Sequence, residues 1–337
     1  MTFSRSAIRL ALLAPVSLVT PAQQFEAPLL GYLVDTAEQR IRGVWGVMGA
    51  AQVGAPIEIG AEVLAGAASP QASHVVVLTG EQRQAAIWLP GETVARRLAG
   101  VPAGADQLTL SPEGNSAAFL YRRENRVLVV SGLPSPTQEP VAIDPTQEPV
   151  AIDLTALRLP LAALAVSDDG QVVAVGEMEP ADAGQRASLI LLGAAGELNR
   201  APASGGVTAI SFASRSHQLV FATASEAWLV TGESLSDSPR RLRAPELAGA
   251  TAVALDRQRA VFAQPGAGQI AWVDLAALDQ PAKVMACNCQ PDTLARLKSG
   301  FRLTDYRGTS LRLLDMTARP RVVFAAPAAA VEPEEQQ

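Results

Sequence analysis

The chain has 337 residues, of which 48% are hydrophobic and 18% are charged. This composition excludes an intrinsically disordered chain, which would be poorer in apolar residues and richer in charge. The formal net charge of −6 offers no basic surface to a phosphate backbone, so we expect no nucleic-acid partner.

The first 22 residues have the pattern of a signal peptide. Arg5 and Arg9 carry positive charge around the start of the short apolar run Leu10–Val19, and Ala22 is the small residue that signal peptidase favours before a cleavage point. We expect cleavage after Ala22, export to the periplasm or the cell exterior, and no membrane insertion afterwards. An uncleaved membrane anchor is the alternative, although the apolar run is short.

Three strand-like runs follow, Leu30–Asp35, Arg40–Val44 and Ala50–Ile59. The first two read as a hairpin. From about residue 62 to residue 326 a longer unit then repeats, in which a short apolar strand ends in a turn and a second strand follows at once. Six copies of the first strand end at Ser69, Ser111, Ser167, Ala213, Asp256 and Lys298.

The intervals between these six strand ends are 42, 56, 46, 43 and 42 residues. The long interval contains residues 136–144 (PTQEPVAID), which recur letter for letter as residues 145–153. Without those nine residues the interval would be 47 residues, in line with the others. A fixed period of this length indicates a repeat architecture.

Each unit continues with a third strand-like run, and some units show a fourth, such as Val94–Leu98 and Arg321–Ala325. The runs are short, rich in Val, Leu and Ile, and bounded by turn residues. The third runs are Ala85–Leu89, Arg126–Val130, Ser188–Leu192, Ala227–Val230, Gln269–Val273 and Ser310–Leu314. Four short antiparallel strands per unit match a propeller blade better than a sandwich.

The predicted fold is therefore an all-β β-propeller with four-stranded antiparallel blades. We expect one propeller domain over residues 23–326 and a disordered acidic tail over residues 327–337. Seven blades are favoured, with residues 28–60 as the seventh. Six blades are the alternative, with the same segment locking the ring against the C-terminal part of the chain.

One turn sequence resembles a known group of repeats. Ser111-Pro112-Glu113-Gly114-Asn115 is similar to the S-P-D-G turn of TolB-like and WD40-like bacterial propellers, and Ser167-Asp168-Asp169-Gly170 is a partial copy. The resemblance implies a propeller fold and no particular activity, because the motif describes a tight turn. The Gly-His and Trp-Asp pairs of eukaryotic WD40 blades are absent from the sequence.

Cys287 and Cys289 are the only cysteines. In an oxidising compartment two cysteines usually pair, although a Cys-x-Cys ring is tight. Three interpretations remain open at this point: a local disulfide, free and partly buried thiols, or a redox or metal-binding pair.

The other polar candidates are interpreted as structural. His74 and His217 hold the same place in blades far apart in the ring, so we expect two surface histidines near turns and no shared site. The Asp168-Asp169-Gly170 segment lacks the alternating oxygen ligands of a calcium loop, and we expect a plain turn. The arginine pairs at residues 122–123 and 240–241 are expected to be solvated turn charges. The tryptophans expected to pack between blades are Trp88, Trp228 and Trp272.

The innermost strands read VLAGAA, QLTLS, ALAVS, AISFA, AVAL and ARLK, almost without acids. Such a channel is poorly suited to the paired carboxylates of glycosidase chemistry. We identify no catalytic, cofactor-binding or metal-binding residues and expect no cofactor. The leading hypothesis is a monomeric, exported binding module for a protein, a peptide or an envelope component. The alternative is a propeller-type hydrolase such as a lactonase.

Overall fold

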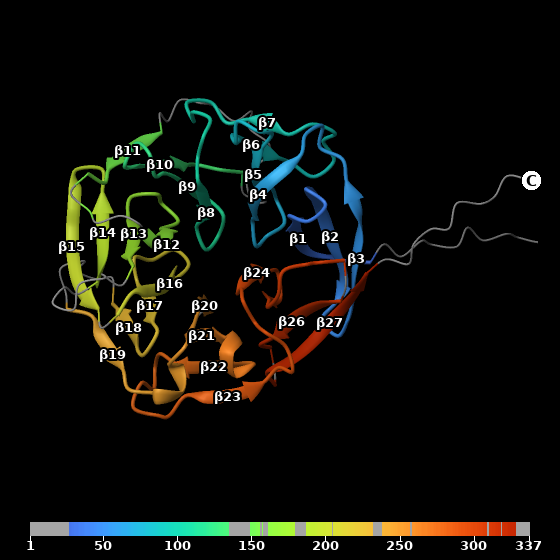
Figure 1. Ribbon diagram of the computed structural model, residues 1–337. Helices are drawn as coiled ribbons and strands as arrows, with labels where there is room; N and C mark the ends of the chain where they lie inside the picture. Colours follow the sequence, from blue (N-terminus) through green and yellow to red (C-terminus); the bar gives the residue numbers. More distant parts are fainter. Residues whose placement is uncertain are drawn as a thin grey trace, which may run out of the picture.

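The computed structural model is a β-propeller, in which small antiparallel sheets stand around a central axis (Figure 1). It describes residues 27–134, 149–155, 157, 161–178, 187–203, 205–231, 238–256, 258–308, 310–317 and 319–327. The expected signal peptide and the first copy of the duplicated segment lie outside the described residues. In this part of the chain no helix is long and apolar enough to cross a membrane.

Five blades are separate four-stranded sheets whose strands follow one another from the axis outward. Blade 2 contains β4 (Val63–Ala68), β5 (Val75–Thr79), β6 (Gln84–Trp88) and β7 (Arg96–Arg97). Blade 3 contains β8 (Gln107–Leu110), β9 (Ser116–Tyr121), β10 (Arg126–Ser131) and β11 (Val150–Asp153). Blade 4 contains β12 (Leu161–Val166), β13 (Val173–Glu177), β14 (Ala187–Gly193) and β15 (Gly196–Ala203). Blade 5 contains β16 (Val207–Phe212), β17 (Leu219–Thr223), β18 (Ala227–Val230) and β19 (Arg240–Leu242). Blade 6 contains β20 (Ala252–Asp256), β21 (Arg259–Gln264), β22 (Gln269–Asp274) and β23 (Lys283–Ala286). The two described helices are short 3₁₀ turns, η1 (Pro245–Leu247) and η2 (Pro265–Ala267).

The remaining sheet joins the two ends of the described chain. Blade 1 contains β1 (Leu29–Asp35), β2 (Arg40–Val47) and β3 (Ala50–Ile57). Blade 7 contains β24 (Ala295–Leu297), β25 (Gly300–Arg302), β26 (Leu311–Asp315) and β27 (Arg321–Pro327). The outermost strands β3 and β27 pair in parallel, so the two blades form one sheet in the order β1-β2-β3-β27-β26-β25-β24 (Figure 1).

The ring therefore has seven blades in the described part of the chain, as favoured from the sequence. Residues 28–60 supply both roles that were considered for them, because they form a blade and their outer strand closes the ring. The last four residues of the second copy, Val150–Asp153, form β11, the outer strand of blade 3. Pro327, the first residue of the expected tail, is the last residue of β27.

Apolar side chains from neighbouring blades bury one another and form the core. Phe119 and Leu128 of blade 3, for example, pack with Val76 and Ile87 of blade 2 in one buried cluster. Trp88 of blade 2 makes an edge-to-face contact with Tyr32 of blade 1, with ring centroids 5.0 Å apart. This is the packing between blades expected for that tryptophan. A blade with two apolar faces is stable only between neighbours that cover both.

Candidate functional site

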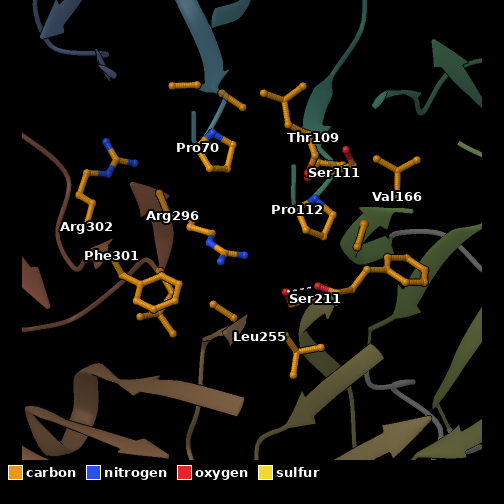
Figure 2. A pocket seen from close by; sticks show the side chains of 18 of the residues that line it. Pro70, Thr109, Ser111, Pro112, Val166, Ser211, Leu255, Arg296, Phe301 and Arg302 are labelled. Carbon is orange, nitrogen blue, oxygen red and sulfur yellow. Dashed lines mark hydrogen bonds between the residues drawn. The ribbon is translucent and has the colours of Figure 1, made fainter. Parts of the chain in front are cut away.

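A cavity of about 300 Å³ lies on the propeller axis, at the carboxyl ends of the innermost strands. All seven innermost strands contribute to its wall, and Figure 2 labels wall residues from blades 2 to 7. The lining residues are Tyr32, Leu33, Val34, Gly66, Ala67, Ala68, Pro70, Thr109, Leu110, Ser111, Pro112, Ala165, Val166, Ile210, Ser211, Phe212, Val253, Ala254, Leu255, Leu294, Ala295, Arg296, Phe301 and Arg302.

Most of the residues that line the wall are apolar, but polar atoms contribute about as much of its exposed surface as apolar atoms do. No carboxylate is among the lining residues. The sequence predicted this small-residue, acid-poor channel. It did not direct attention to the charged members of the wall, Arg296 and Arg302, which both belong to blade 7. For Arg296 the available signal was the strand ARLK, since the other innermost runs quoted above contain no arginine or lysine. Arg302 lies outside these runs, on β25.

Arg296 extends from β24 toward the middle of the cavity (Figure 2). Its Nη1 donates a hydrogen bond of 3.0 Å to Ser214 Oγ on the turn of blade 5. Its Nη2 lies 3.5 Å from Asp256 Oδ1 at the end of β20. A blade 7 guanidinium is thus held by groups from blades 5 and 6, which fixes its place on the cavity wall.

Arg302 is the second cation of the wall. Its Nη2 lies 3.3 Å from Asp305 Oδ1, whereas its buried Nε has no hydrogen-bond partner. Burial lowers the pKa of Arg302 below its ordinary value, and the negative charges of Asp305 and Asp292 partly oppose this effect. Burial of a cation without full hydrogen bonding is unfavourable.

A second recess, of about 670 Å³, adjoins the cavity between blades 6 and 7 and shares Arg296 and Phe301 with it. Arg259 and Lys298 bring further positive charge to this recess, and Asp256 is the acid in its wall. Arg259 Nη1 donates a 3.3 Å hydrogen bond to the carbonyl oxygen of Met316.

The turns that surround the cavity are linked from blade to blade through Asp168. This side chain is 8% exposed, and its Oδ1 accepts a 2.8 Å hydrogen bond from the backbone N–H of Glu113 in blade 3. Its Oδ2 accepts a 2.7 Å bond from the backbone N–H of Arg215 in blade 5. The turn expected at Asp168 is present, and its carboxylate also connects three consecutive blades.

The two histidines lie in blades 2 and 5 and share no site, but one expectation about them is wrong. His74 is fully buried, with Ser73 Oγ 2.9 Å from its Nδ1 and no hydrogen-bond partner at Nε2. Desolvation lowers its pKa to about 4, although the backbone carbonyls of Pro134 and Gly114 act in the opposite direction. His217 is partly exposed, and its Nε2 lies 2.9 Å from Asp169 Oδ2.

A turn of the neighbouring blade contributes to the burial of His74. Blade 3 has five residues between β8 and β9, and this turn includes Gly114, whose backbone lies against His74.

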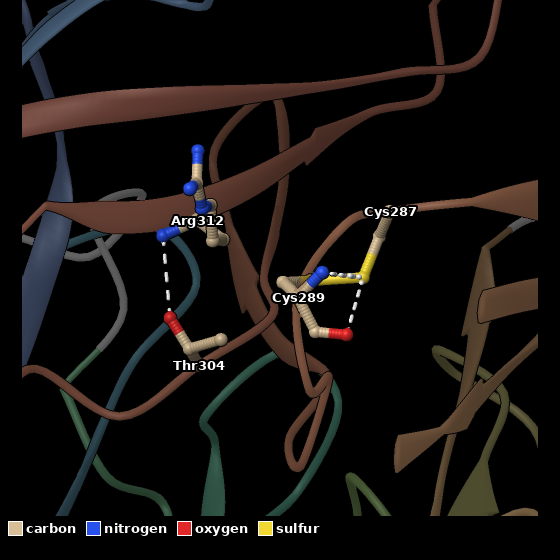
Figure 3. Close-up of a disulfide and its surroundings, with 4 residues drawn as sticks. All are labelled: Cys287, Cys289, Thr304 and Arg312. Atoms are coloured by element: carbon tan, nitrogen blue, oxygen red, sulfur yellow. Dashed lines mark hydrogen bonds between the residues drawn. A yellow bond between two sulfur atoms is a disulfide. The ribbon is translucent and has the colours of Figure 1, made fainter. Parts of the chain in front are cut away.

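Cys287 and Cys289 are joined by a disulfide, with Cα atoms 5.1 Å apart (Figure 3). The pair follows β23, where blade 6 passes to blade 7, and Cys287 is buried among apolar side chains of these two blades. Within the described residues no group of three or more His, Cys, Asp or Glu side chains is arranged to hold a metal ion.

The comparisons with known proteins identify the fold. No protein-family model and no curated protein matches the chain. Among solved structures, Sqt1 of Chaetomium thermophilum is 14% identical with a TM-score of 0.54, over 87% of this chain and 78% of that one. Sqt1 bound to the N-terminus of ribosomal protein L10 is 15% identical with a TM-score of 0.52, over 86% and 79%. A functionally unknown protein of Desulfotomaculum acetoxidans is 10% identical with a TM-score of 0.54, over 88% and 99%.

Proposed function

We propose that this chain is an exported interaction module that binds a protein or peptide through the central cavity. The observation that carries the proposal is a hollow on the axis, walled mostly by apolar residues from all seven blades, into which the anchored side chain of Arg296 extends. Preformed apolar hollows with a few placed polar groups are typical of binding sites. Sqt1, which has a similar fold, has been solved with the N-terminus of ribosomal protein L10 bound, and this supports a peptide-binding role.

Export is part of the same proposal, with the periplasm or the cell exterior as the destination. It is supported by the basic and apolar sequence of residues 1–22 and by the bond between Cys287 and Cys289, because disulfides persist in oxidising compartments. N-terminal sequencing of the protein from the producing cell should begin at Gln23. An N-terminus at Met1 or Thr2 in the mature protein would contradict export by cleavage.

We further infer a relationship to TolB-like propellers and a monomeric state. The turn at residues 111–115 supports the first. For the second, the ring already closes within one chain, through the pairing of β3 with β27. Sedimentation of the purified protein at a mass near 35.1 kDa, less the signal peptide, is the expected result, and a dimer mass would contradict the second inference.

The binding proposal is tested by selecting displayed random peptides on three forms of the protein. Ala67→Trp places a large ring in the cavity wall, whereas Val94→Trp is a control at a side chain that is 60% exposed outside it. We expect selected peptides to bind the wild type and Val94→Trp and to lose affinity for Ala67→Trp. Peptides that bind all three forms equally would place the site elsewhere.

Failure to select any peptide would count against a binding module. The hydrolase alternative has its own readout on the same three proteins. Turnover of a panel of lactones by the wild type and Val94→Trp, but not by Ala67→Trp, would replace the binding proposal with the enzymatic one.

A further inference from the structure

The charge around the central cavity is opposite to that of the chain. The whole sequence carries a formal charge of −6, yet four cations line the cavity and the adjoining recess, with Asp256 as the acid in the two walls. We call the surface that these four side chains form, across the walls of the cavity and the adjoining recess, the basic recess. Its residues are Arg259, Arg296, Lys298 and Arg302. A concave surface that concentrates one sign of charge attracts ligands of the other sign.

The arginines of the basic recess have donors to spare. A guanidinium carries five N–H groups, and Arg296 uses two of them, on Ser214 and Asp256. Because these two contacts hold the side chain in place, its other N–H groups are presented without a large loss of side-chain entropy on binding. Arg302 brings a second guanidinium to the wall of the central cavity, with its Nη2 beside Asp305.

The surroundings of these cations indicate what kind of anion fits. Val34, Leu110 and Ile210 line the central cavity and are partly exposed, so they give its wall an apolar surface that a ligand can reach. A small inorganic anion would leave this surface uncovered. A peptide that carries a carboxylate next to an apolar side chain would satisfy the arginines and cover the apolar wall at the same time.

We infer that the basic recess binds an acidic peptide segment of the partner, with an Asp or Glu carboxylate on Arg296 and a neighbouring apolar side chain in the central cavity. This inference rests on the proposed function, since it names the partner of that same cavity. It assigns Arg296 as the main contact and the other three cations as contributors to the local potential.

Two fluorescein-labelled pools of amidated decapeptides test the inference by fluorescence anisotropy. One pool has Leu-Glu-Glu-Leu at its centre and the other Leu-Gln-Gln-Leu, with the same randomised flanks. We expect the wild type to bind the acidic pool about tenfold more tightly, a factor typical of one charge-assisted hydrogen bond. Raising the salt concentration should reduce the preference, because the charges lie at a partly solvated site.

Substitutions test which residues cause the preference for the acidic pool. Arg296→Gln should abolish most of it, Lys298→Gln should reduce it about two- to threefold through the potential alone, and Arg97→Gln, at an exposed position on β7, should leave it unchanged. Urea unfolding checks that each variant is folded. If Arg296→Gln is unfolded, the inference is tested by Lys298→Gln and by the salt dependence, and an unchanged preference in both measurements would overturn it.

The outcomes separate this inference from the binding proposal. Equal affinity of the wild type for the two pools, with both lost in Ala67→Trp, would overturn the acidic ligand and leave the binding module in place. Binding of neither pool, while displayed peptides still bind, would also overturn the inference. A preference for the acidic pool that survives in both Arg296→Gln and Lys298→Gln would place the acidic ligand outside the basic recess.

Discussion

Gly114 has a backbone φ of +84°, and a Cβ at this position would lie 2.8 Å from Ser69 Oγ of the neighbouring blade. The glycine of the turn motif therefore meets two demands at once, a left-handed backbone and close contact between blades. Gly104 has a similar φ of +96° but nothing within 4 Å of its Cβ position. Substitution of Gly104 therefore tests the left-handed backbone alone, without a close contact between blades.

Gly114→Ala should lower the free energy of unfolding by about 2–4 kcal/mol, because the strained backbone and the overpacked contact both oppose the methyl group. Gly104→Ala should cost only about 1 kcal/mol, from the backbone alone. Urea titrations of the two variants give the comparison. Equal losses would show that the contact with Ser69 is not a constraint.

His74 gives a pH-dependent stability at the residue scale. Burial lowers the folded-state pKa from 6.5 to about 4, so between these values the unfolded chain binds a proton that the folded chain does not. The folded state is therefore favoured above pH 6.5 and loses this advantage as the pH falls toward 4. The expected loss between pH 7 and pH 5 is about 2 kcal/mol.

The measurement is the free energy of unfolding of the wild type and of His74→Gln at both pH values. The variant lacks the titrating group, so its stability should fall by about 2 kcal/mol less than that of the wild type over the same interval. Parallel pH profiles for the two proteins would show that His74 is not held neutral by the fold.

At the scale of elements, β27 connects the two ends of the ring. Ala325 pairs with Leu311 of β26 and with Ala51 of β3, and its side chain is fully buried in the cluster shared by blades 1 and 7. The next residue, Ala326, is exposed on the same strand. The two alanines thus form a matched pair of positions on the closing strand.

Ala325→Asp should destabilise the protein by more than about 3 kcal/mol, because a carboxylate would be buried among apolar side chains without a partner. Ala326→Asp should change the free energy of unfolding by about 0.5 kcal/mol or less. Denaturant midpoints measured on both variants test this. A mild effect of Ala325→Asp would indicate that β27 can detach while the ring stays folded.

The strands were predictable from the sequence because each blade repeats the same short apolar runs and turns. Strands and turns are specified by residues close together in the sequence, and the innermost strands therefore lie at the positions that the repeat predicted. Asp168 is an example of a residue whose contacts could not be predicted from nearby sequence. Its turn could be predicted, but its hydrogen bonds to Glu113 and Arg215 depend on which turns meet across the ring. The candidate site could not be predicted for the same reason, because Arg296 makes its contacts with blades 5 and 6, which are distant in the sequence.

At the scale of the whole molecule, the ring is closed by hydrogen bonds between β3 and β27, strands from its first and last blades. Each blade depends on its neighbours for burial of both apolar faces. Separation of blades 1 and 7 would therefore expose Leu33 and Leu313 together, since both belong to their shared buried cluster. This dependence predicts that a covalent link across the closure stabilises the entire propeller.

The register of the closing pair gives the position for such a link, since Gln52 and Ala326 are opposite each other. The double substitution Gln52→Cys and Ala326→Cys, once oxidised, should raise the free energy of unfolding by about 2–4 kcal/mol, because it constrains a loop that includes most of the chain. The double serine variant at the same positions is the control, and mass spectrometry of a digest verifies the new bond beside the native one. Guanidinium titration should show one transition at a higher denaturant concentration for the cross-linked protein. An unchanged midpoint, or an early transition that remains despite the link, would mean that the blades come apart first at another junction.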